Sequence, residues 1–199
     1  MCHVCGMTSV SDKKDLILQF EERFAFDLSR EVMEAPKLSF WMILIPIFLV
    51  YHVYQHKRIA EGRKSFAWNY LVARKQALEE SADFVKKGGR PRIAEIVRDS
   101  ELPEHARGPF KELLTVLADH YADLLRAEGD DYESLVRSAY RRRADYLLLV
   151  NRLSQCERGL NKALMPQLKD QVSGAGEVIK KMEAASEKLR RERAEQIFC

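Results

Sequence analysis

The feature that most constrains this chain is an uninterrupted apolar run at residues 38–55, LSFWMILIPIFLVYHVYQ. Its 18 residues include no Asp, Glu, Lys or Arg, although these four types make up 32% of the whole chain. A helix that crosses the ~30 Å hydrocarbon core of a bilayer needs about 20 apolar residues. The run therefore predicts a membrane segment at residues 38–56. The alternative is a core helix of a soluble protein, for which so little polar interruption is unusual.

Aromatic and basic side chains flank the run as they do at membrane interfaces, where amphipathic rings favour the headgroup layer. The predicted interface residues are Trp41, Pro46, Tyr51, Tyr54, Lys57, Arg58, Arg63 and Lys64. Within about 20 residues of each end, six Lys or Arg follow the run and three precede it. This excess predicts contact with membrane lipid and a cytoplasmic location for the C-terminal region, at an inner or plasma membrane.

Pro46 lies near the middle of the run and leaves its topology open. A proline removes one helical hydrogen bond and clashes with the preceding turn, so a spanning helix would be kinked there. In a re-entrant segment the same proline would supply the bend, and both chain ends would stay in the cytoplasm. We favour the simple span from sequence, with the N-terminal residues outside.

The remainder of the chain has helical spacing, and no segment shows the alternation of a strand. The sequence predicts a Cys/His segment at residues 1–10 and an amphipathic helix at 11–35, whose apolar stripe includes Ile17, Phe24 and Leu28. After the membrane segment we expect a basic juxtamembrane helix at 57–90 and a helical bundle at 91–199. The expected fold class is all-α and membrane-anchored.

Within the bundle region, breaks at glycine and proline predict the helix limits. We expect a short helix at residues 91–98 and a second helix that opens at Gly108-Pro109. We expect one long helix from 132 to 164, which Pro166 then stops or kinks. Apolar residues of this long helix recur at heptad spacing and predict helix–helix contacts. They include Tyr146, Leu149, Leu153 and Leu160. A charged tail helix at 177–195 would fold back as a coiled-coil-like partner.

Two groups of residues suggest chemistry. Cys2, His3 and Cys5 are thiolate and imidazole ligands that suit zinc, but a closed structural site needs four ligands and the chain has no second CxxC. Four cysteines at irregular spacing are too few for a disulfide framework. His120 lies between Asp119 and Asp123, and a carboxylate can orient an imidazole as a general base. We expect His120 to be a surface or partly buried residue.

The absence of a convergent polar set favours a non-enzymatic function, and we expect no cofactor. The region 101–199 has 17 basic and 17 acidic residues, so its arginines do not predict nucleic-acid binding. The favoured hypothesis is a membrane-anchored adaptor or scaffold that binds a protein partner or self-associates. Two alternatives are an accessory subunit of a larger membrane complex, and an enzyme or metal protein that uses Cys2 and Cys5 or His120.

Overall fold

The computed structural model describes residues 8–33, 60–171 and 175–199, which form helices and no strands within these ranges. This confirms the all-α prediction. The helices are α1 (Val10–Met33), α3 (Ala60–Lys87), α4 (Ile93–Asp99), α5 (Glu104–Arg126), α6 (Tyr132–Tyr140), α7 (Arg143–Gln171) and α8 (Ala175–Ile197).

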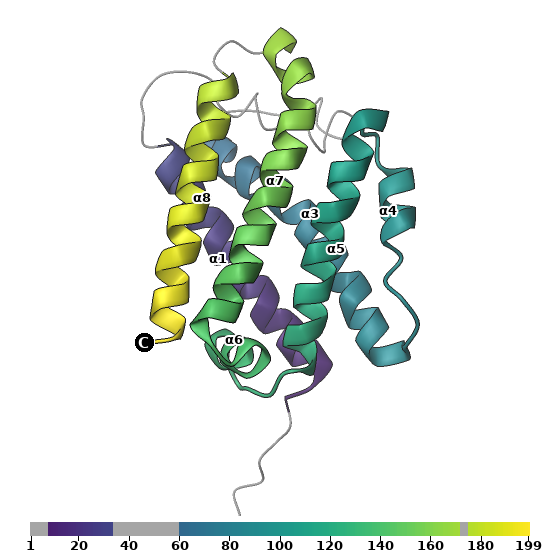
Figure 1. The fold of residues 1–199 in the computed structure, drawn as a ribbon, viewed down its shortest axis with the longest axis vertical. Coiled ribbons are helices and arrows are strands. Elements are labelled where there is room, and N and C mark those ends of the chain that lie inside the picture. The colour runs from purple at the N-terminus through teal and green to yellow at the C-terminus, as the bar shows by residue number, and fades with distance from the viewer. Residues whose placement is uncertain (1–7, 34–59, 172–174) are drawn as a thin grey trace, which may run out of the picture.

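The five long helices lie side by side in a bundle, and the two short ones complete it (Figure 1). Helix α4 lies against α5, while α6 crosses one end of the bundle near the C-terminus (Figure 1). The central helix α5 packs against both α3 and α7, and α1 packs against α3 and α8. The N-terminal helix therefore belongs to the same bundle as the C-terminal helices.

Helices α1 and α3 run antiparallel, as their ion pairs show. Lys14 pairs with Glu79 at 2.8 Å, and Glu22, two turns further along α1, pairs with Lys75 at 3.0 Å. Later residues of α1 thus meet earlier residues of α3. The end of α1 and the start of α3 consequently lie at the same end of the bundle (Figure 1).

The core is built from the apolar stripes of the long helices. Helix α5 contributes the largest share, including Phe110, Leu114 and Leu117, each at most 1% exposed. The predicted stripe of α1 is also buried, with Ile17 and Leu28 completely enclosed. Because burying one such side chain contributes about 1.5–3 kcal/mol, these stripes account for most of the stabilisation of the bundle.

The predicted membrane segment at residues 38–56 lies outside the described residues. Among the helices that the structure does describe, none combines the length and the apolar character needed to cross a bilayer. The structure therefore gives no support to a membrane-anchored fold class, and the anchor rests on the sequence alone.

Two predicted helix limits are wrong. Helix α5 begins at Glu104 after Pro103, so Gly108-Pro109 lies inside it rather than at its start. The predicted long helix from 132 to 164 is two helices, because Arg141 has a φ of 56° and ends α6. No glycine or proline marks this break, since Arg141 is a non-glycine residue in a rarely occupied backbone region. The break lets α6 cross the end of the bundle.

The predicted coiled-coil pair is a part of the bundle. Helices α7 and α8 pack together, but α7 also packs against α5 and α8 against α1, so they do not form an isolated coiled coil. Helix α7 continues through Pro166, where we predicted a stop or a kink, as far as Gln171.

Two glycines offer a matched test of the fold. A Cβ on Gly129 would clash with Ser134 and lie 2.9 Å from the backbone nitrogen of Leu135, in the capping box that Asp131 and Ser134 form at α6. We expect Gly129→Ala to lower the free energy of unfolding by about 1–3 kcal/mol. Gly108→Ala fills open space inside α5 and should raise it by about 0.5–1 kcal/mol. Urea denaturation measures both, and equal effects would contradict this assignment.

Candidate functional site

Four charged side chains meet in the interior of the bundle, each from a different helix. They are Glu21 of α1, Arg74 of α3, Glu157 of α7 and Arg190 of α8, and we call them the Arg–Glu cluster. The side chains of Arg74 and Arg190 are only 5% and 7% exposed. Charged residues are rarely buried to this degree unless they are paired.

Each member of the cluster interrupts the apolar stripe of its helix. Glu21 follows Ile17 by four residues and precedes Phe24 by three, and Arg190 likewise lies between Ser186 and Ala194 on the buried face of α8. Helical periodicity places residues three or four apart on one face. A charged residue at a stripe position was therefore the signal in the sequence that could have revealed the cluster.

Glu157 joins the two arginines. Arg190 donates from both terminal nitrogens to the two carboxylate oxygens of Glu157, each at 2.7 Å, and Arg74 Nη2 donates to Glu157 Oε1 at 2.6 Å. The Arg190 contact is bidentate, which gives an arginine–carboxylate pair both directionality and strength. Glu157 thus links α3, α7 and α8 through one carboxylate.

Two tyrosines, Tyr121 and Tyr70, contact the Arg–Glu cluster. Tyr121 donates to Glu21 at 2.7 Å, and Arg74 Nε lies 3.0 Å from the other Glu21 oxygen without a hydrogen bond to it. Arg190 donates to the Tyr70 hydroxyl at 2.9 Å, and the Arg74 guanidinium lies 3.8 Å from the centre of the Tyr70 ring. Two arginines face two glutamates, so the cluster is electrically neutral.

Burial and the charges of the cluster together determine the protonation states of Glu157 and of the adjoining Tyr70. Burial alone would raise the pKa of Glu157, but the charges of Arg190 and Arg74 and their hydrogen bonds outweigh it and lower this pKa to about 2. Burial raises the pKa of Tyr70 to about 12, although Arg190 and Arg74 oppose this shift. Glu157 is therefore ionised, and Tyr70 protonated, at physiological pH.

His120 lies beside the cluster and is buried, which corrects the expectation of a surface or partly buried residue. Its Nδ1 lies 2.6 Å from the Tyr140 hydroxyl, and neither Asp119 nor Asp123 is hydrogen-bonded to the ring. Burial, reinforced by the charges of Arg74 and Arg190, lowers the pKa of His120 to about 3. An imidazole this weakly basic is poorly matched to general-base chemistry at neutral pH.

The space between these groups is small. A cavity of about 30 Å³ is lined by three cluster members, by His120 and by aromatic residues such as Phe20 and Tyr132, whose rings stack 3.6 Å apart. The three members are Glu21, Arg74 and Arg190. This volume holds about one or two water molecules. The arrangement can bind water and fix four helices together, but it has no room for an organic substrate.

The other predicted site residues lie elsewhere. Cys2, His3 and Cys5, and the interface residues from Trp41 to Arg58, lie outside the described residues, as do the side chains of Arg63 and Lys64 in α3. In the described ranges, no three His, Cys, Asp or Glu side chains gather as metal ligands. Tyr146, Leu153 and Leu160 are buried within the bundle, and Leu149 is partly buried against its core.

Comparison of the chain with protein-family models, with curated proteins and with solved structures found no match.

Proposed function

We propose that this chain is a non-enzymatic helical scaffold that is tethered to a membrane by residues 38–56 and presents its bundle to a protein partner in the cytoplasm. The observation that carries the proposal is the position of the apolar run, which joins two helices, α1 and α3, of a bundle whose own apolar faces are already buried. The described helices already form a core of their own from the apolar stripes of the long helices. Membrane lipid is the environment that suits it.

The interior of the bundle supports a scaffold over an enzyme. The Arg–Glu cluster is neutral and mutually paired, and the adjoining cavity of about 30 Å³ admits water alone. Buried polar networks whose groups are hydrogen-bonded rigidify a fold, and Arg74 Nε is the one cluster atom among the described residues that is buried without a hydrogen bond. A rigid bundle is what a scaffold requires.

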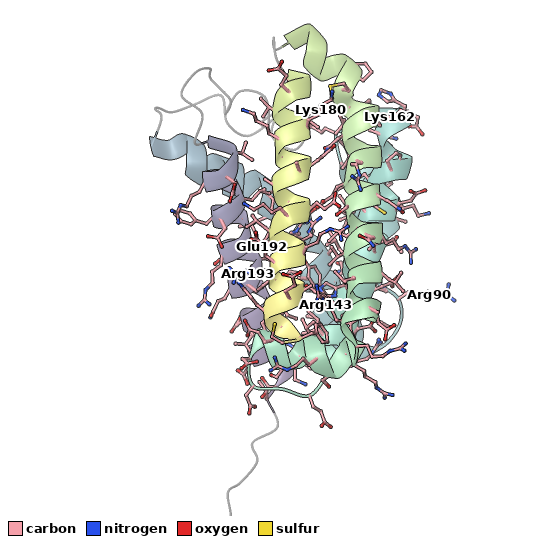
Figure 2. The ribbon with its side chains drawn as sticks, turned by 60° about the vertical axis from the view of Figure 1, so that its left-hand side comes forward. Arg90, Arg143, Lys162, Lys180, Glu192 and Arg193 are labelled. Carbon is pink, nitrogen blue, oxygen red and sulfur yellow. The ribbon has the colours of Figure 1, made fainter. Side chains whose placement is uncertain are left out.

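One surface feature supports a protein partner. Phe26 of α1 is 53% exposed. It lines a groove of about 500 Å³ together with its neighbour Asp27 and with Arg193 of α8. Arg193 and its neighbour Glu192 lie on the face of α8 that adjoins α1 (Figure 2). An exposed aromatic ring within a charged rim is typical of protein interfaces.

Flotation with lipid vesicles tests the tether. The full chain should float with the vesicles, whereas a variant in which residues 38–55 are replaced by a Gly/Ser linker of equal length should remain at the bottom. Because the described helices bury their apolar stripes against one another, the linker variant should keep the cooperative thermal unfolding of the bundle, followed by circular dichroism. Leu148→Ser, which removes an exposed apolar side chain of the described bundle, is the control and should float normally. Flotation of the linker variant would refute the tether.

A further inference from the structure

We propose that all the described helices lie on one side of the bilayer, so that the apolar run enters and leaves the membrane through the same face. This inference rests on the proposed membrane tether. It reverses the topology that the positive charge after the run favours from sequence, in which the N-terminal helix lies outside.

The pairing of α1 with α3 carries the inference. A single span between them would place α1 and α3 on opposite sides of the membrane, yet the two helices pack along their length. Ion pairs join them at Lys14–Glu79 and Glu22–Lys75, and the ring of Phe24 stacks against that of Tyr70. Both helices therefore belong to one compartment.

The Arg–Glu cluster makes the separation of α1 still more costly. Removing α1 would take Glu21 from Arg74 and from Tyr121, and would leave Arg74 buried with one carboxylate fewer. It would also open the core that Ile17, Phe24 and Leu28 fill. A buried charge that loses its partner is strongly destabilising.

The length of the connecting segment fits entry and exit at one face. The end of α1 and the start of α3 lie at the same end of the bundle (Figure 1), and 26 residues join the two helices. Pro46 divides the apolar run into halves of eight and nine residues, and such a half rises only about 13 Å as a helix, less than half of the ~30 Å hydrocarbon core. The run can therefore embed in one leaflet and return.

The geometry also assigns the face of the bundle that meets the lipid. It is the end at which α1 ends and α3 begins, opposite to α6 and the C-terminus (Figure 1). The exposed Lys162 of α7 and Lys180 of α8 lie toward this same end (Figure 2). Lysines near an anionic membrane surface favour its attachment.

Two single-cysteine versions of the full chain test the topology. All native cysteines are replaced by serine, except that one version keeps Cys199 and the other carries Asp15→Cys on α1. Cys199 and Asp15 are both exposed, so each thiol is accessible after lysis. A membrane-impermeant maleimide is added to intact cells in one sample and to lysed cells in a second sample. We expect both thiols to react only after lysis. Labelling of both thiols in intact cells would also place α1 and the C-terminus on the same side of the membrane.

Labelling of one thiol in intact cells and of the other only after lysis would overturn the inference while leaving the tether intact. Membrane fractionation of the same cells separates the two claims. If the protein is absent from the membrane fraction, the tether fails and the one-sided topology fails with it.

Discussion

Replacement of Glu157 by alanine should lower the free energy of unfolding by about 3–5 kcal/mol, the loss expected when one partner of a buried ion pair is removed. Glu157 accepts from Arg74 and makes a bidentate contact with Arg190. Both guanidinium groups would remain buried without this carboxylate. Urea denaturation followed by circular dichroism measures the change.

Glu195→Ala is the matched control, because Glu195 is 58% exposed and pairs with Arg143, itself 48% exposed. An exposed pair contributes about 0–1 kcal/mol, so this variant should unfold almost as the parent protein does. If Glu157→Ala lowered the free energy of unfolding by no more than Glu195→Ala, the Arg–Glu cluster would not be a principal contact between the helices.

Acidification should destabilise the bundle in two steps. The pKa of His120 is about 3 in the folded chain, against 6.5 for an unperturbed histidine, so the unfolded chain takes up a proton first and stability falls as the pH drops below about 6.5. At ~1.4 kcal/mol per pH unit, this loss is on the order of 4 kcal/mol by pH 3. Glu157, with a pKa of about 2 against 4.5, begins to add to the loss below about pH 4.5.

His120→Gln separates the two steps, because glutamine does not titrate and can still hydrogen-bond to Tyr140. Thermal unfolding measured from pH 8 to pH 3 should show a stability that is constant in this variant down to about pH 4.5, while the parent protein declines from about pH 6.5. Parallel pH profiles for the two proteins would show that burial of neutral His120 is not the cause.

The sequence predicts the parts of this fold that local patterns determine. Helix α1 begins at Val10, one residue before its predicted start, because its apolar stripe is regular, and α3 ends at Lys87 because Gly88-Gly89 follows. The break at Arg141 was not predictable in this way. It depends on the packing of α6 across the bundle end, where Tyr140 reaches His120, and no local signal encodes that packing.

The Arg–Glu cluster shows where sequence reasoning reaches its limit. Glu21 and Arg190 each interrupt an apolar stripe, which indicates a polar group facing the core, but they are 169 positions apart and their shared contacts arise only from the bundle. Arg74 belongs to the excess of basic residues that follows the apolar run and indicates its topology. The structure places Arg74 in the core, so its charge does not report on the membrane surface.

Amide hydrogen exchange on the vesicle-bound full chain tests most directly whether the bundle stays whole while the apolar run is in the membrane. We predict that peptides from α1 and α3 are as strongly protected on vesicles as peptides from α5, because α1 and α3 remain paired through the Arg–Glu cluster and the core. Loss of protection in α1 or α3 on vesicle binding would show that the bundle opens at the membrane, and would contradict this account.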